Sequence, residues 1–378
     1  MKKSLIALSV AGAFLAAGAQ AADVQIYGLI DQGVSYQNYD ADDGTGSVST
    51  FSMNDAMEFG SRWGIRGSED LGNGLKVGFT LESGFRADTG AMDNNGRLFG
   101  RESTVSLSGG FGTLTFGNMP VFGSTLGANG LFRAIDPVNA NQTNAFGSGA
   151  ATASSWLRAD NAVSYKTPTF AGLTGYAMYS FKMNTLSKTD AGTEGQGGQS
   201  DRYAALALRY LQGPVEAILV ADTTMYGTKN TVASKADDAY TVTLGGNYTF
   251  DNGLKVLAFG QYFENVVMTT GAGPNYAKTG SLLGGYGIDM GGYGLGIGMN
   301  MPALGGKVSL GLNYRDMTDD ATDIDYTRWS VAAGYDYALS KRTSLYAMTG
   351  YSEEEKDTGS ETRKPTAYEL CLGIVHRF

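Results

Sequence analysis

The sequence predicts an all-β protein, a transmembrane antiparallel β-barrel of about sixteen strands. Three observations favour this fold. The composition suits strands and turns, with 55 glycines, 22 tyrosines, 17 phenylalanines and only seven prolines. Mean hydropathy is -0.16, which is too low for a helical membrane protein. Apolar and polar residues alternate along most of the chain, so that one face of each strand can meet lipid while the other meets water.

The chain begins with the features of a secretory signal peptide. Lys2-Lys3 forms a basic n-region, Leu5 to Ala17 an apolar h-region, and Ala19-Gln20-Ala21 a cleavage site. The apolar run is shorter than the ~20 residues that a membrane-spanning helix needs. We therefore expect residues 1–21 to be removed on export, so that the mature barrel comprises residues 22–378.

Charge and composition argue against several kinds of site. The chain has 28 basic and 37 acidic residues, and loss of the two lysines of the leader leaves a net charge of −11. Nucleic-acid binding is not expected, because it requires a basic face. Cys371 is the only cysteine, so it cannot form an intramolecular disulfide, and we expect it to be a packed small residue. His376 is the only histidine and has no plausible metal partners, so neither a metal site nor a cofactor is expected.

The strands follow one another as hairpins. A first strand from Asp23 places Val24, Ile26, Ile30 and Val34 on one face. A turn at Asn73-Gly74 is a strong hairpin signal, and the return strand alternates apolar Leu75, Val77, Phe79 and Leu81 with polar Lys76, Thr80 and Glu82. The later strands within 240–250, 307–315 and 328–337 alternate most clearly. The strand within 216–222 is apolar on both faces, which we interpret as contact with other protein segments.

Turn and loop spacing gives the strand number. Short turns are expected near 68–73, 109–110, 167–171, 212–214, 251–253, 303–306 and 339–342. Long loops are expected near 37–57, 87–100, 118–157, 183–200, 227–237, 266–291, 317–325 and 352–365. Short turns at one end, long loops at the other and an even strand count are typical of transmembrane barrels, as are Trp and Tyr clusters at strand ends.

The third long loop, about 118–157, differs from the rest of the chain. It runs for about forty residues without sustained alternation, and a connection this long is usually functional or disordered. Its apolar residues favour burial against a surface: Phe122, Leu126, Leu131, Phe132, Ile135, Phe146 and Trp156. We therefore expect this loop to fold onto another part of the protein.

Several motifs together resemble a known family. They are Ser61-Arg-Trp-Gly-Ile-Arg-Gly-Ser-Glu-Asp-Leu-Gly-Asn-Gly-Leu-Lys, Phe111-Gly-Thr-Leu-Thr-Phe-Gly, Arg158-Ala-Asp-Asn-Ala-Val-Ser-Tyr and the terminal Phe378. Over the whole mature chain they resemble the general diffusion porins of Gram-negative outer membranes, in the group typical of β-proteobacteria. The resemblance implies a homotrimer in the outer membrane, among its lipid and lipopolysaccharide. It also implies that the third loop folds into the lumen as a constriction, and that the barrel-assembly machinery reads Phe378 as an insertion signal.

Parity and the resemblance give the candidate pore residues. Side chains alternate between the two faces of a strand, and this parity places Tyr27, Arg62, Arg66, Lys76 and Arg158 on the face toward the lumen. Arg101 lies at the start of a strand, where the alternation does not fix its face. The resemblance implies that arginines on the wall face the constriction loop, and Arg62, Arg101 and Arg158 match in position. Within the loop, Arg133 and Asp136 are the charged candidates. The alternative interpretation is that these side chains are ordinary solvated lumen charges or loop anchors.

The expected function is passive diffusion of ions and small hydrophilic solutes through a water-filled pore. Rings of charge set the ion preference of a pore. Most of the charged candidate residues here are positive, which predicts weak anion selectivity. A substrate-specific outer-membrane channel and an adhesin-like or receptor-like barrel remain as alternatives. Enzymatic activity is not expected, because an activated nucleophile usually needs a histidine base and no catalytic constellation accompanies His376.

Overall fold

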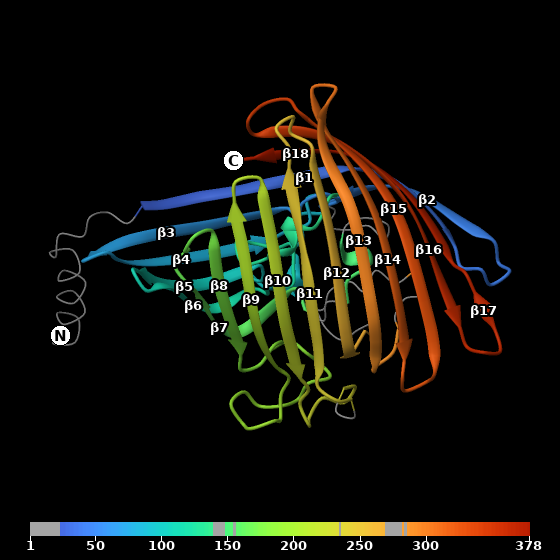
Figure 1. The fold of residues 1–378 in the computed structure, drawn as a ribbon, viewed down its shortest axis with the longest axis horizontal. Coiled ribbons are helices and arrows are strands. Elements are labelled where there is room, and N and C mark those ends of the chain that lie inside the picture. Colours follow the sequence, from blue (N-terminus) through green and yellow to red (C-terminus); the bar gives the residue numbers. More distant parts are fainter. Residues whose placement is uncertain (1–22, 139–147, 154–155, 234–235, 269–281, 283–285) are drawn as a thin grey trace, which may run out of the picture.

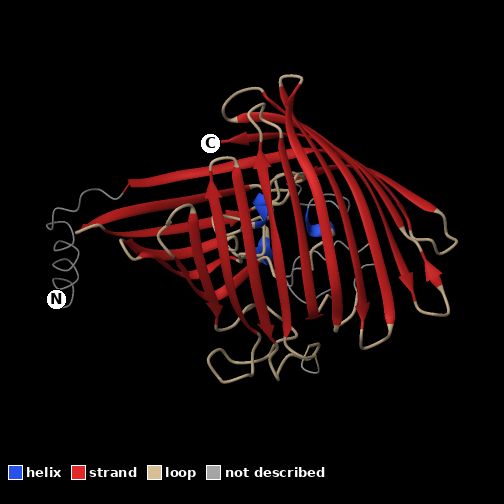
Figure 2. Ribbon diagram, viewed as in Figure 1, coloured by secondary structure: helices blue, strands red, loops and turns tan. Residues whose placement is uncertain are grey.

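The computed structural model describes residues 23–138, 148–153, 156–233, 236–268, 282 and 286–378. The signal peptide expected at residues 1–21 lies outside this part of the chain. The described residues form one antiparallel sheet of 18 strand segments and three one-turn 3-10 helices. Figure 2 shows the helical turns enclosed by the strands.

The strand segments are numbered in chain order (Figure 1). They are β1 (Asp23–Asp40), β2 (Ser47–Asp55), β3 (Arg62–Gly72), β4 (Leu75–Gly84), β5 (Glu102–Gly109), β6 (Gly112–Pro120), β7 (Arg158–Lys166), β8 (Leu173–Ser180), β9 (Arg202–Gln212), β10 (Val215–Met225), β11 (Ala239–Thr249), β12 (Lys255–Val266), β13 (Met290–Ala303), β14 (Gly306–Asp319), β15 (Ile324–Ala338), β16 (Thr343–Asp357), β17 (Thr362–Arg363) and β18 (Thr366–Arg377). The helical turns are η1 (Asn94–Gly96), η2 (Phe132–Ala134) and η3 (Ser148–Ala150).

The barrel has sixteen strands, as the sequence predicts. β2 and β3 pair with successive parts of β1, and β17 and β18 pair with successive parts of β16, so each of these pairs of segments forms one strand. The first and last strands close the barrel in an antiparallel register that runs from Leu29 opposite Arg377 to Asp40 opposite Thr366. In the described part of the chain every strand of the barrel therefore has a neighbour on both sides, as a membrane-spanning sheet requires.

The alternation that predicted the strands separates an apolar outer face from a polar inner face. On β11, Tyr240, Val242 and Leu244 are exposed on the outside, whereas Thr241 and Thr243 are buried on the inside. β10 carries buried Ile218 and Val220 on its inner face, where they join an apolar cluster. The protein contact predicted for residues 216–222 is therefore confirmed.

The bounds of three predicted loops are wrong, because the strands continue beyond the apolar band. β1 extends to Asp40 and β2 begins at Ser47, within the predicted loop 37–57. β14 likewise extends to Asp319, and β16 to Asp357. Outside the lipid both faces of a strand meet water, so the apolar alternation stops although the backbone ladder does not. Hydrogen bonds such as Tyr36 Oη to Ser49 Oγ (3.0 Å) connect these polar extensions.

Cys371 and the chain end lie where the barrel closes. Cys371 is fully buried on the inner side of β18 within an apolar cluster, as predicted. Phe378 follows β18, and its backbone exchanges two hydrogen bonds with Gly28 of β1, each 3.0 Å long. No helix in the described part of the chain is long and apolar enough to span a membrane.

Candidate functional site

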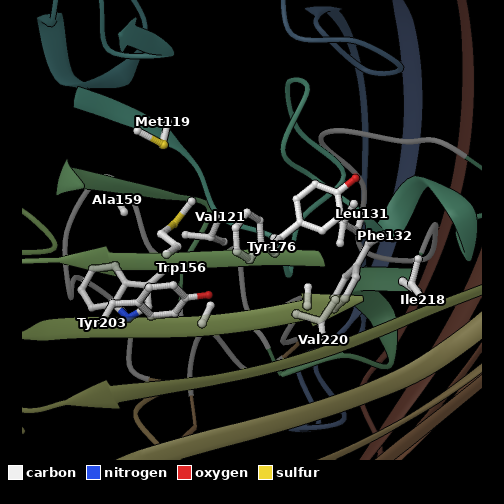
Figure 3. Close-up of a cluster of buried hydrophobic side chains, with 14 of the residues drawn as sticks. Met119, Val121, Leu131, Phe132, Trp156, Ala159, Tyr176, Tyr203, Ile218 and Val220 are labelled. Carbon is white, nitrogen blue, oxygen red and sulfur yellow. The ribbon is translucent and has the colours of Figure 1, made fainter. Parts of the chain in front are cut away.

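The constriction loop (residues 121–157, between β6 and β7) packs on the inner faces of β8 to β12 where it is described. Its apolar side chains and those of the wall form one buried cluster (Figure 3). From the loop come Val121, Phe122, Leu131, Phe132, Ile135, Ala151 and Trp156; from the wall come Tyr176, Met178, Tyr203, Ala205, Ala207, Ile218, Val220 and Phe259. The loop is therefore held in the barrel by an apolar core, as the sequence predicts for Phe122, Leu131, Phe132, Ile135 and Trp156. Phe146 lies outside the described residues.

Hydrogen bonds from the wall fix the polar backbone of the same loop. The indole Nε1 of Trp156 donates to Thr224 Oγ1 (2.9 Å), and the backbone N of Ala153 donates to Gln261 Oε1 (2.6 Å). Further along, Asn247 donates to the carbonyl of Ala134 (2.8 Å) and Asn300 to that of Pro137 (2.7 Å). The wall amides thus satisfy buried backbone groups that a loop would otherwise leave without partners.

Close backbone approach explains two glycines of the wall. A Cβ on Gly294 would lie 2.0 Å from the carbonyl oxygen of Ala151, and one on Gly298 would lie 2.5 Å from the ring of Pro137. Only glycine permits such an approach without displacing the loop. Glycines on the inner face of β13 therefore allow the constriction loop to approach closely at both Ala151 and Pro137.

A charged cluster lies on another part of the wall, formed by β3, β4 and the starts of β5 and β7. Glu82 of β4 is its centre. Its Oε1 accepts a hydrogen bond from Arg101 Nε (2.7 Å), and its Oε2 accepts one from Tyr27 Oη (3.0 Å). Arg62 Nε lies 3.9 Å from Oε2, within ion-pair distance. Glu82 thus orients two of the predicted pore arginines together with Tyr27.

Two further arginines complete the cluster. Arg158, at the start of β7, is buried and donates from Nε to the carbonyl of Arg101 (2.8 Å), so it lies next to Arg101. Arg133 projects from η2 of the constriction loop, and its Nε donates to the carbonyl of Thr125 (2.6 Å). Partial burial and the positive charge of Arg101 lower the pKa of Arg133, which places the loop cation within electrostatic reach of the wall.

The structure brings Arg62, Arg101, Arg133 and Arg158 together, with Tyr27 beside them. The charges of Arg101, Glu82 and Arg133 all act on Arg62. Those of Arg101, Glu82, Asp93 and Arg62 act on Arg158. Asp136 is half-buried on the loop, and its charge acts on Arg133. These residues come from distant parts of the chain, so the barrel and its loop assemble the cluster.

Arg66 and Lys76 lie outside the centre of this cluster. Arg66 follows Arg62 by four residues on β3, about 13 Å along the strand, and donates to Gln25 Oε1 from Nε (3.2 Å) and Nη2 (3.0 Å). Its guanidinium also stacks over the ring of Tyr27, 4.9 Å from the centroid. Lys76 is exposed near the β3–β4 turn, opposite Asp70. Both belong to the approach to the cluster rather than to its centre.

Two glutamates of the cluster were not among the predicted site residues. Glu82 shares the parity of Lys76 on the polar face of the strand within 75–86, so the same alternation could have identified it. Glu102 lies at the start of β5, where its charge interacts with those of Glu82, Arg101 and Arg158. Glu102 lies next to Arg101 at the start of a strand, where alternation does not show which face the side chain takes.

Arginines outnumber glutamates in this cluster. Four arginines surround Glu82 and Glu102, while Asp93 acts on Arg158 and Asp136 of the loop acts on Arg133. In a water-filled passage such fixed charges raise the local concentration of ions of opposite sign. The arrangement can attract anions. In the described residues, no His, Cys, Asp and Glu side chains gather in a group that could hold a metal ion.

Comparisons with known proteins agree with this architecture. The model of the Gram-negative porin family matches residues 7–357. An outer membrane porin protein of Bordetella pertussis is 33% identical over 400 residues, covering 100% of both chains. Outer membrane porin protein 32 of Delftia acidovorans is 34% identical over 354 residues, covering 93% of this chain and 89% of its own.

Solved structures give the same result. The anion-selective porin from Comamonas acidovorans superposes with a TM-score of 0.69 at 26% identity, covering 94% of this chain and 100% of its own. The outer membrane channel DcaP of Acinetobacter baumannii superposes with a TM-score of 0.62 at 15% identity, a likeness of fold alone. Together with the sixteen-stranded barrel and its lumen-folded loop, these matches show that the chain belongs to the Gram-negative porin family, whose members form diffusion channels in the outer membrane.

Proposed function

We propose that this channel passes ions and small hydrophilic solutes passively, with a weak preference for anions set by its arginine cluster. The observation that carries the proposal is the convergence of Arg62, Arg101 and Arg133 around one carboxylate, Glu82. Arg158, buried and bonded to the carbonyl of Arg101, adds a fourth positive charge. The similar porin from Comamonas acidovorans is anion-selective, which agrees with this assignment.

The two walls of the passage have different roles in this proposal. The constriction loop narrows the lumen, since barrels of sixteen or more strands otherwise leave a wide aqueous channel. The arginines opposite raise the local anion concentration. At the edge of the charged region, Tyr27 is bonded to Glu82 and Asp136 acts on Arg133. Arg66 and Lys76 extend the positive charge toward the end of the barrel that carries the short turns. The protein has no catalytic role in this account.

The test is the reversal potential of the purified protein in a planar bilayer under a salt gradient. We expect a stable open channel with mild anion preference, and a smaller preference in Arg62→Ala and Arg158→Ala. Arg209→Ala is a matched control, because Arg209 has its own partner in Glu216, 2.7 Å away on the neighbouring strand. Cation preference of the wild type would contradict the arginine assignment, and absence of conductance would contradict the open pore.

We also propose that the chain forms a homotrimer surrounded by outer-membrane lipid and lipopolysaccharide. The family resemblance supports the trimer, and large apolar side chains on the outer face of β1 and β2 provide contact surface: Ile26 and Phe51 are each 72% exposed and Met53 is 62% exposed. Electrophoresis of unheated samples in mild detergent should give a trimer that dissociates on heating. A stable monomer in native detergent extracts would contradict this proposal.

Phe378 serves, in this proposal, as the signal that the barrel-assembly machinery reads. Its side chain is 48% exposed at the closing seam, where a partner can reach it. Deletion of Phe378 should lower the amount of protein inserted into the outer membrane while leaving synthesis and export unchanged. Equal insertion of the deletion variant would contradict the role.

A further inference from the structure

The strand formed by β2 and β3 is interrupted by a segment that leaves the barrel wall. β2 ends with Asp55 opposite Gln32, and β3 begins with Arg62 opposite Leu29. The intervening residues, 56–61, are here called the brace. Ala56 has a φ of 58°, a left-handed conformation that alanine rarely adopts, and it marks the point where the chain turns out of the sheet.

One buried carboxylate on β1 holds the brace against the inner wall. Oδ2 of Asp31 accepts hydrogen bonds from the backbone N of Glu58 (2.8 Å) and of Phe59 (2.6 Å). Its backbone carbonyl accepts from the N of Ala56 (3.0 Å), and its backbone N donates to Ser61 Oγ (3.1 Å). Asp31 is fully buried, so these contacts fix the brace at both ends.

The apolar side of the brace shares a core with the constriction loop. Met57 is 2% exposed and lies in one buried cluster with Val138, the residue at which the first described part of the loop ends. The wall contributes the remaining members: Leu29, Ala332, Tyr346, Met348, Cys371 and Val375, with Phe59 packed against them. Displacement of the brace would therefore alter the surface on which the loop rests.

The other end of the brace leads directly into the arginine cluster. Ser61 is buried, and its carbonyl accepts a hydrogen bond from the N of Phe85 (3.1 Å), just after β4. The next residue is Arg62, the first arginine of the cluster. One short segment is thus joined to the constriction loop on one side and to the charged wall on the other.

At the middle of the brace, Glu58 faces a second carboxyl group. It is 6% exposed and interacts with Asp336 of β15, which itself forms an ion pair with Lys307 (2.9 Å). Asp31 also acts on Glu58, with the sign that disfavours its charged form. The titratable or charged groups around the brace are Asp31 on β1, Lys307 on β14, Asp336 on β15, Tyr346 on β16, and Cys371 and Arg377 on β18.

We propose that the brace is a proton-dependent support of the pore: it holds the constriction in place while the Glu58–Asp336 pair retains one proton, and releases it when both carboxyls ionise. A protonated Glu58 can donate a hydrogen bond to Asp336, whereas the buried carboxylate of Glu58 and the half-buried carboxylate of Asp336 repel each other when both are charged. The inference rests on the proposed constriction and adds to it a second inserted segment that positions Arg62 and Val138.

The electrostatics agree with a proton held at neutral pH. Burial, followed by the charge of Asp336, raises the pKa of Glu58 to about 9. Below this pH Glu58 is neutral and the brace is held. Above it the pair carries two negative charges, Lys307 compensates only one, and the constriction loses its support.

Single-channel recording between pH 7 and 10.5 tests the proposal. Wild-type channels should stay open up to about pH 8 and then show a severalfold rise in closures, over the roughly two pH units that one titrating group needs. Glu58→Gln mimics the neutral acid, so its recordings should show no transition. Glu369→Gln is the matched control, because Glu369 is also a buried acid of the inner wall, bonded to Gln37 (2.9 Å), and should retain the wild-type transition.

Asp336→Asn keeps the test decisive if Glu58→Gln assembles poorly. Removing the facing charge should lower the pH at which the transition occurs, since Glu58 then ionises more easily. A transition at the same pH in wild type and Glu58→Gln would overturn the proposal, as would a wild type without any transition. Failure of the arginine assignment would appear separately, as unchanged reversal potentials in Arg62→Ala at pH 7.

Discussion

The inner wall from β8 to β13 and the inner wall around β3 and β4 are built from similar strands but carry different side chains. The first buries apolar and amide side chains under the constriction loop, with Phe122, Ile135 and Trp156 almost inaccessible to water. The second gathers Arg62, Arg101 and Glu82. Under the proposed function, the first wall positions the loop that narrows the pore, and the second wall sets the ion preference. Changes on one wall should therefore leave the property set by the other largely intact.

The largest expected effect comes from removing the main anchor of the loop. Trp156→Ala deletes a side chain that is 1% exposed and its hydrogen bond to Thr224. Loss of a buried tryptophan costs about 3–5 kcal/mol in soluble proteins, so the loop should detach while the barrel persists. Single-channel recordings should show larger and noisier openings, with the sign of selectivity unchanged. Openings like those of the wild type would mean that the loop is held elsewhere.

A smaller change to the same wall is Gly294→Ala. The new Cβ would meet the carbonyl oxygen of Ala151 at 2.0 Å, so the loop must shift, at a cost of about 1–3 kcal/mol. We expect altered conductance and a lower temperature of heat-induced unfolding. Gly334→Ala is the control, since its Cβ would lie an ordinary 3.5 Å from Val138. Equal effects of the two substitutions would argue against the tight fit at Gly294.

On the charged wall, Arg101→Ala should have the greatest effect. It removes the arginine closest to Glu82 and leaves that carboxylate facing the passage with less compensation. A unit charge at 4 Å contributes about 1 kcal/mol in water, which corresponds to a change of up to about fivefold in the anion-to-cation permeability ratio. Reversal potentials measure the ratio directly. A shift toward greater anion preference would contradict the assignment.

Glu82→Gln should move selectivity in the other direction. The amide keeps the size of the side chain but removes one of the two acidic charges among the arginines, so anion preference should rise. The effect on selectivity should be smaller than that of Arg101→Ala. Arg62 and Arg101 lose their partner and become less ordered, and less ordered arginines attract anions less at a fixed point of the passage. Reversal potential and conductance should be compared at low and high salt, since screening weakens an electrostatic effect.

The smallest effect is expected for Arg66→Ala. Arg66 is bonded to Gln25 and stacked on Tyr27 at the margin of the cluster, whereas Arg101 pairs directly with Glu82. Its removal should change the permeability ratio much less than Arg101→Ala does. Equal changes would show that the whole lumen, and not the cluster, sets selectivity.

Much of the fold could be predicted because alternation with a period of two residues survives wherever one face meets lipid. It identified the sixteen strands. It does not fix the face of Arg158, because the pairing of β6 with β7 shifts register between Gly117 and Met119. It did not locate the ends of β1 and β14, because strands beyond the lipid are polar on both faces. It also did not reveal the brace, since nothing in residues 56–61 distinguishes an inserted segment from a polar loop.

The site was only partly predictable for a related reason. Parity places a side chain on a face, but not at a height along the barrel or beside a particular partner. Arg66 and Lys76 share the face of Arg62 and yet lie outside the centre of the cluster, whereas Arg101 and Glu82 meet through strand register. The position of the loop depends on contacts such as Asn247 with Ala134, which only the closed barrel brings together.

The most direct test of the division between the two walls is a paired recording of conductance and reversal potential for Trp156→Ala and Arg101→Ala. Trp156→Ala should change conductance and noise with the sign of selectivity preserved, whereas Arg101→Ala should shift the reversal potential toward cations with conductance changed less. If both variants change both properties together, pore width and ion preference are not set by separate walls.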